Sequence, residues 1–147
     1  MKGSPNYEDR MIQTVVVQDT IERIQQLLYI NDTLEQRKER IEYYYNLYYL
    51  SQEKALKAQS EALDKGLTKR YFKSLYAEVY YYLCITICLM RTINIEYEFI
   101  QEDIDKTIEL FSISKRGNYL RSLDSLLSSS RCIFSHKNIR KIGAIYQ

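Results

Sequence analysis

The sequence predicts an all-α protein, a single bundle of about five helices. Four glycines and one proline among 147 residues are too few for the tight turns of a sheet protein or for glycine-rich phosphate loops, so long helices with short connections are favoured. Apolar residues recur at helical spacing, and a content of 46% hydrophobic and 27% charged residues is globular. We expect one domain over residues 1–147, with a polar lead at 1–10 and a basic C-terminal segment at 114–147.

The first two helices are predicted from their apolar stripes and from the residues between them. A helix over about 11–30 turns Val16, Ile24 and Leu28 inward, and Asn31 and Asp32 end it. Asp32 and Glu35 form a capping box for the longest helix, at about 33–64, which stops before Gly66. Apolar residues repeat every seven positions along this long helix, at Leu34, Ile41, Tyr48, Ala55 and Ala62.

The third helix, over about 69–92, is expected at the centre of the bundle. Its stretch from Val79 to Met90 is apolar on all sides, as in a fully surrounded helix. Periodicity alone leaves a buried strand open as the alternative for this stretch. The run is also too short to span a bilayer, which needs about 20 apolar residues.

Two shorter helices complete the predicted bundle. The fourth has an apolar side from Ile100 to Phe111 and an acidic opposite face. A turn at 115–118 leads to the fifth, for which Asn118 is the expected N-cap. This helix places Phe134 inward, and the serines at 128–130 mark a kink or an end.

Charge is distributed unevenly although the net charge is only +2. Beyond residue 113 the only acidic residue is Asp124, whereas the stretch just before residue 114 is acidic. A basic end on a near-neutral protein indicates a polyanionic partner, most often nucleic acid. Side-by-side packing of the acidic and basic helices is the alternative. The candidate nucleic-acid-binding residues are Lys115, Arg116, Arg121, Arg131, Lys137, Arg140 and Lys141.

Fifteen tyrosines and no tryptophan are a further unusual feature. The triplets at 43–45 and 80–82 put rings on three helix faces at once, so some rings must be exposed or lie in an interface. A helix–helix or oligomer contact is the favoured fate, and we therefore expect a homodimer. Stacking on bases beside Arg37, Lys38 and Arg40 is the alternative.

The three cysteines and the one histidine fall into two pairs, and the two members of each pair are four residues apart. Cys84 and Cys88 lie in the third predicted helix, and Cys132 and His136 lie in the fifth. Such pairs on two helix faces could close a tetrahedral zinc site, whereas cysteines in an aliphatic helix also pack as small hydrophobes. We expect no cofactor, with zinc as the alternative.

Arg131 and His136 form an Arg-x4-His motif, with Phe134-Ser135 before the histidine. The motif resembles the signature of the HEPN superfamily of small helical ribonucleases and toxins, although Cys132 stands where that family has a polar residue. The resemblance implies Arg131 and His136 as a catalytic pair that cleaves RNA without metal at a dimer interface. Histidine would move the proton and arginine would hold the phosphate.

The sequence lacks the templates of common nucleotide-binding enzymes and hydrolases, such as GxxxxGK[ST], GxGxxG, GxSxG, HExxH and CxxC. The three cysteines and the absence of a signal-like N-terminus predict an intracellular, cytoplasmic protein that does not engage membranes. The tyrosine-rich, glycine-poor composition is similar to that of small virus-encoded proteins, which would place it in a host cell or virion.

These observations favour a non-catalytic regulator or inhibitor. It would bind nucleic acid, or a protein complex that handles nucleic acid, through the basic C-terminal segment. The alternatives are a HEPN-like endoribonuclease and a zinc-stabilised interaction protein.

Overall fold

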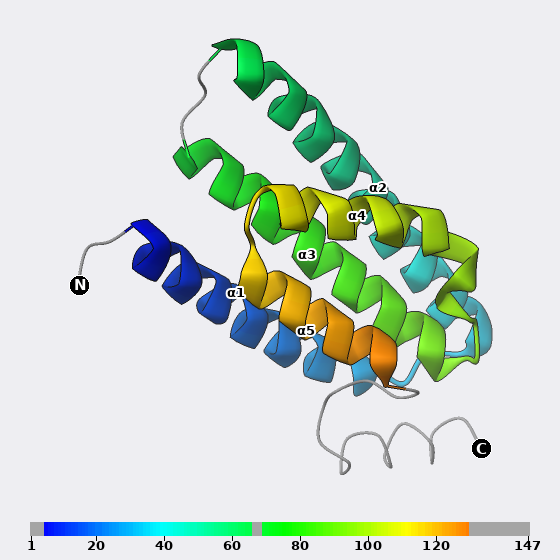
Figure 1. Cartoon of the computed structure of the whole chain (residues 1–147). Helices are drawn as coiled ribbons and strands as arrows, with labels where there is room; N and C mark the ends of the chain where they lie inside the picture. The colour runs from blue at the N-terminus through cyan, green and yellow to red at the C-terminus, as the bar shows by residue number, and fades with distance from the viewer. Residues whose placement is uncertain (1–4, 66–68, 130–147) are drawn as a thin grey trace.

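The predicted all-α bundle with a long second helix is confirmed. A computed structural model describes residues 5–65 and 69–129 of the chain. Within these ranges it contains five α-helices and one short 3₁₀ helix, shown in Figure 1. Their bounds are α1 Pro5–Leu28, α2 Leu34–Lys65, α3 Lys69–Thr92, η1 Tyr97–Ile100, α4 Gln101–Ile113 and α5 Gly117–Ser128.

Helix α3 is the centre of the bundle and contacts every other helix in the described part of the chain (Figure 1). The stretch from Val79 to Met90 is helical, which excludes the strand alternative. From Leu83 to Met90 every side chain is buried. A helix that is apolar all round is stable in water only when other elements cover it, and here α1, α2, α4 and α5 do so.

The starts of α1 and α2 both differ from the prediction. Helix α1 begins at Pro5 and not near residue 11, because proline fits the first helical position, where its missing N–H is not needed. The capping box of α2 is formed by Thr33 and Gln36 and not by Asp32 and Glu35. The Thr33 Oγ1 accepts from the Gln36 N–H at 3.1 Å, and the Gln36 Oε1 accepts from the Thr33 N–H at 2.9 Å.

Asp32 instead joins a buried ion cluster that ties the α1–α2 loop to α2 and α3. Its carboxylate accepts two hydrogen bonds from the Arg40 guanidinium, at 2.9 and 3.0 Å, and lies 3.0 Å from Arg37 Nε. Arg37 is fully buried and also donates to the Ile30 carbonyl at 3.0 Å and to Thr92 Oγ1 at 3.5 Å. The two arginines, of which Arg40 contributes the strongest effect, lower the pKa of Asp32 against the opposing effect of burial.

Helices α3 and α4 both end with residues in the left-handed conformation. Asn94 (φ 61°) follows α3 and Lys115 (φ 59°) follows α4. After α4, Arg116 N–H donates to the Phe111 carbonyl at 2.8 Å and Lys115 N–H donates to the Ser112 carbonyl at 3.2 Å. This is the Schellman arrangement, which satisfies the last carbonyls of a helix.

Helix α5 is capped by another helix and not by Asn118 as predicted. The N-cap position is Arg116, which makes no side-chain cap bond. The Oε1 atom of Gln13 in α1 accepts from the backbone N–H groups of Asn118 at 3.0 Å and Tyr119 at 3.3 Å. At the other end Ser129 is extended, so the serines end the helix. The predicted continuation to Phe134 lies outside the described residues.

Helix α4 is held on α2 by a buried hydrogen-bond network. Tyr48 OH donates to the Asp103 carbonyl at 2.8 Å and lies 2.7 Å from Thr107 Oγ1. Gln52 Nε2 donates to the same hydroxyl, carbonyl and threonine oxygen at 2.7–2.8 Å. Tyr45 OH donates to the Asp103 carboxylate at 2.8 Å. Because every member has a partner, this network fixes how α4 sits on α2.

Candidate functional site

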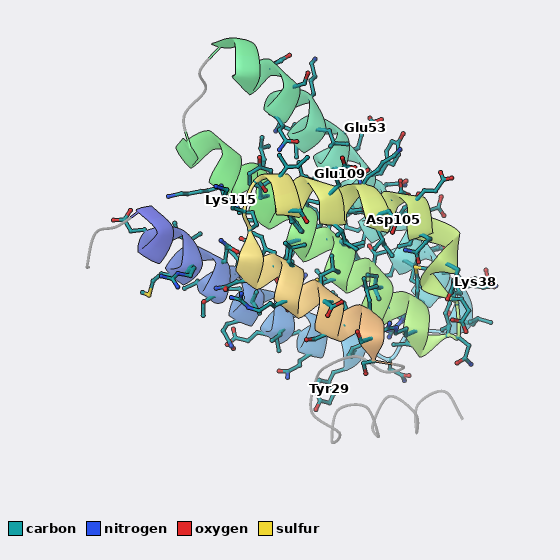
Figure 2. All side chains as sticks on the ribbon, viewed as in Figure 1. Tyr29, Lys38, Glu53, Asp105, Glu109 and Lys115 are labelled. Atoms are coloured by element: carbon teal, nitrogen blue, oxygen red, sulfur yellow. The ribbon has the colours of Figure 1, made fainter. Side chains whose placement is uncertain are left out.

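Two of the basic residues expected to bind nucleic acid lie exposed around the α4–α5 turn. Lys115 is the left-handed residue of the turn, and Arg121 lies one turn into α5. The Arg121 guanidinium bends back toward the start of α5, where it donates to the side-chain oxygen of Asn118. Figure 2 shows Lys115 at the end of α4, pointing away from the bundle.

Arg116 lies between these two residues in the sequence but occupies a different environment. Its side chain is only 7% exposed, and its guanidinium lies over the Tyr76 ring, 4.8 Å from the ring centre. This cation–π contact joins the α4–α5 turn to α3. The burial favours a structural role for Arg116, which leaves Lys115 and Arg121 as the exposed cations of the predicted set among the described residues.

The α1–α5 junction brings a third exposed cation to the same end of the bundle. Asn118 Nδ2 donates to the Arg10 carbonyl and to Thr14 Oγ1, both at 3.0 Å. The start of α5 is thereby fixed against the first turns of α1. Lys73, half-buried, lies one turn before Tyr76 on α3. We call Arg10, Lys73, Lys115 and Arg121 the basic end.

The outer side of α4 carries the opposite charge. Exposed acids follow one another along it at helical spacing, and Lys106 is the one base among them. Figure 2 shows Asp105 and Glu109 on this side of α4, with Lys115 beyond them at the helix end. The exposed acids are Glu102, Asp105 and Glu109. A polyanion that approached the basic end along α4 would meet these acids.

Tyrosines from both predicted triplets meet between α2 and α3. Tyr44 is buried and contacts the rings of Tyr43, at a centroid distance of 5.2 Å, and Tyr82, at 6.4 Å. Tyr82 also contacts Tyr81 edge to face at 5.3 Å. Burial raises the pKa values of Tyr81 and Tyr82, so both hydroxyls remain protonated at neutral pH. The rings form a helix–helix contact, as the favoured interpretation predicted.

The base-stacking alternative for these tyrosines is not favoured by the positions of the neighbouring arginines. Arg37 is fully buried, and Arg40 is held by Asp32 through two hydrogen bonds. Lys38 is exposed and pairs with Glu35 at 3.7 Å. A nucleic-acid site that uses rings needs accessible cations beside them.

The two described members of the proposed zinc site are buried thiols in α3. Cys84 is 3% exposed and Cys88 is fully buried, both among aliphatic and aromatic side chains of the core. Cys132 and His136, the other two proposed ligands, lie outside the described residues. Among residues 5–65 and 69–129 there is no group of three or more histidine, cysteine or acidic residues that could hold a metal.

The tyrosines packed between α2 and α4 are protonated at neutral pH. Burial is the main cause that raises the pKa of Tyr45 to about 12 and that of Tyr48 further. Both therefore act as hydrogen-bond donors at neutral pH, and the network they belong to is packed between α2 and α4. Arg131 and His136, the proposed catalytic pair, lie outside the described residues, as do Lys137, Arg140 and Lys141.

No family model, curated protein or solved structure matches this chain. In the described ranges, no helix is long and apolar enough to cross a membrane.

Two α1 residues that complete the region around the basic end, Arg10 and Gln13, are not among those predicted from the sequence. Arg10 was assigned to the polar lead, and Gln13 looks like any polar residue of an amphipathic helix. Its burial, with only 2% exposure, is a consequence of packing against α5. A polar residue on the apolar face of α1, one turn before Val17, was the available signal.

Proposed function

We propose that this protein is a non-catalytic regulator that binds nucleic acid, or a complex that handles nucleic acid, through its basic C-terminal part. The observation that carries the proposal is the convergence of exposed Arg10, Lys115 and Arg121 where α1 meets the α4–α5 turn. These cations come from three separate segments, and the Gln13 and Asn118 hydrogen bonds hold two of the segments together.

The proposal also includes the cations that follow α5 in the sequence, which lie outside the described residues. Arg131, Lys137, Arg140 and Lys141 come within the eighteen residues after Ser129. Each lysine or arginine that neutralises a phosphate releases counterions, which makes affinity fall steeply with salt. Electrostatic contacts of this kind position a protein on nucleic acid without reading sequence.

Fluorescence anisotropy with labelled duplex DNA and single-stranded RNA, at several salt concentrations, tests the proposal. The wild type should bind at low salt. The single variants Lys115→Ala and Arg121→Ala should each reduce the slope of log affinity against log salt by about 0.9 on duplex DNA. Lys106→Ala removes the same charge from the acidic side of α4 and is the matched control. Absence of binding to either polymer at low salt would refute nucleic-acid binding and leave a protein partner.

The endoribonuclease alternative rests on Arg131 and His136 and on the all-helical architecture. It is distinguished by the fate of the RNA in the same experiment, followed on a denaturing gel. If the chain cleaves RNA, His136→Ala should abolish cleavage and leave affinity nearly unchanged, since the acid/base group is lost and little charge is removed. Intact RNA after prolonged incubation with the wild type supports the binding protein.

The zinc alternative is decided by elemental analysis of protein purified without chelator. A four-ligand structural site retains its metal, so less than about a tenth of an equivalent of zinc would refute it. If zinc is present, Cys88→Ser should lower the melting temperature more in zinc-loaded protein than in metal-stripped protein.

A further inference from the structure

Several helix ends meet at the end of the bundle opposite the basic end. Helices α1, α3 and α5 end there, and α2 begins there (Figure 1). Arg37 joins two of these ends, since it donates to the Ile30 carbonyl and to Thr92 Oγ1. Arg91 joins α3 to the end of α5, because its Nη1 donates to the Leu126 carbonyl at 2.7 Å. We call this region the loop end of the bundle.

Large apolar side chains are exposed at the loop end. Tyr29 is 48% exposed, Ile30 is 38% exposed and Leu34 is 52% exposed, all three around the α1–α2 connection. Figure 2 shows Tyr29 pointing away from the helices. A connection between helices is ordinarily polar, so exposed apolar residues this close together indicate a contact surface. We call these three residues the apolar loop patch.

A cavity of about 330 Å³ opens at the same end, beside the point where the described chain ends. Its walls come from the end of α3, from the α3–η1 region and from the end of α5, where Ser128 and Ser129 line it. The exposed charged residues of its wall are Glu96 and Glu98. The residues that follow Ser129 therefore start at the wall of an acidic cavity.

The end of α5 lies near the level of the apolar loop patch. Helices α1 and α5 run in the same direction (Figure 1), and Gln13 contacts the Asn118 N–H. Ten residues on from this contact along both helices, Ser128 lies level with about Arg23. Tyr29 is six residues farther along α1, which is about 9 Å at the rise of an α-helix.

The eighteen residues after Ser129 have the length and the chemistry to cover this surface. Phe134 is the fifth of them, and five residues of extended chain reach about 17 Å. Arg131 is the first charged residue, and the segment contains no acid. Its charge is thus opposite to that of the cavity. The large apolar residues of the segment are Ile133, Phe134, Ile139, Ile142, Ile145 and Tyr146.

We propose that the segment 130–147 folds back over the loop end, with Phe134 on the apolar loop patch and Arg131 beside Glu96 and Glu98. Removal of apolar surface from water drives the contact, and the opposite charges fix its register. The inference does not rest on the proposed function. Of the cations proposed to bind nucleic acid, the contact engages only Arg131.

A tryptophan in place of Phe134 tests the proposal in the full chain, because the sequence has no tryptophan of its own. Phe134→Trp should emit at short wavelength and resist quenching by acrylamide, since its ring is covered. Adding Leu34→Asp should shift the emission to longer wavelength and raise the quenching rate severalfold. An acid suits the first turn of α2, so this change preserves the fold. Val15→Asp, at a 55% exposed position of α1, is the matched control and should change neither quantity.

Two further variants of the Phe134→Trp chain separate the apolar contact from the charged one. Tyr29→Ser removes the other side of the apolar loop patch without touching α2 and should expose the tryptophan as Leu34→Asp does. Glu96→Lys with Glu98→Lys should expose it as well. Asp105→Lys with Glu109→Lys makes the same change of charge on the outer side of α4 and should leave the emission unchanged.

The proposal is overturned if the tryptophan of Phe134→Trp is freely quenched. It is equally overturned if Leu34→Asp and Tyr29→Ser leave the tryptophan covered, or if the two pairs of charge reversals act alike. The emission should not depend on protein concentration, because the contact lies within one chain. Emission that moves to short wavelength only as the concentration rises would assign the patch to a second copy and would also overturn the proposal.

Discussion

Gln13 in α1 caps α5 from outside, with its side-chain oxygen 3.0 Å from the backbone nitrogen of Asn118. The same oxygen also accepts from the Tyr119 N–H at 3.3 Å. The first N–H groups of a helix have no partner within the helix, so a buried helix start needs acceptors from elsewhere. Here residues more than a hundred positions apart in the sequence complete one helix end.

Gln13→Met should therefore destabilise the fold by about 1–2 kcal/mol, because methionine keeps the shape and removes the acceptor. Urea unfolding followed by circular dichroism measures the change. Gln18→Met, an exposed position on the same helix, is the control and should stay within about 0.5 kcal/mol of wild type. Equal losses in the two variants would contradict the capping role.

Asp32→Asn should cost about 3–5 kcal/mol, because it leaves the fully buried Arg37 without its counter-charge. Thermal or urea unfolding at neutral pH gives the value. Glu35→Gln breaks the exposed pair with Lys38 and should cost no more than about 1 kcal/mol.

Stability should also fall in acid for the same reason. The folded-state pKa of Asp32 is lowered, so its stabilisation is complete above the unfolded pKa of about 3.9 and is lost as pH falls through the folded value. The loss below about pH 4 should be smaller in Asp32→Asn than in wild type. Parallel acid curves for the two proteins would refute this assignment.

Tyr48→Phe should destabilise the protein by about 1–3 kcal/mol, because the removed hydroxyl bonds to Asp103, Thr107 and Gln52 in a buried network. Tyr43→Phe, at a 60% exposed position, is the matched control and should be nearly neutral. Unfolding in urea compares the two, and a neutral Tyr48→Phe would show that the network does not hold α4 on α2.

Lys115→Gly should separate stability from binding. The left-handed conformation at this position costs lysine about 1 kcal/mol of free energy, a cost that glycine does not have. The variant should be more stable by about that amount and, under the proposed function, should bind nucleic acid more weakly. Lys115→Ala loses the same charge without the conformational gain, so the pair of variants isolates each effect.

The helical architecture was predictable because each helix carries its own apolar periodicity. The apolar stripe predicted along α2 is confirmed in part. Tyr48 and Ala55 are fully buried, but Leu34 is 52% exposed at the helix start. The capping box was displaced by one residue because Asp32, the expected cap, binds two arginines that come later in α2. Local patterns do not record which tertiary partner competes for a polar side chain.

The site was less predictable because it depends on how helices meet. Nothing in the local sequence distinguishes buried Arg116 from exposed Lys115 beside it, since the difference arises from the Tyr76 ring on α3.

In the described part of the chain α1 and α2 do not pack directly against each other, and this has a consequence for folding. These are the first helices of this chain to be synthesised, and in the described structure each is covered by α3 and by a later helix. The α1–α2 pair thus has no apolar core of its own and must wait for α3. The folding nucleus is then expected to form between α2 and α3, in the middle of the chain. Helix α1 then packs on α3, and its contacts are completed when α5 supplies the helix start that Gln13 caps.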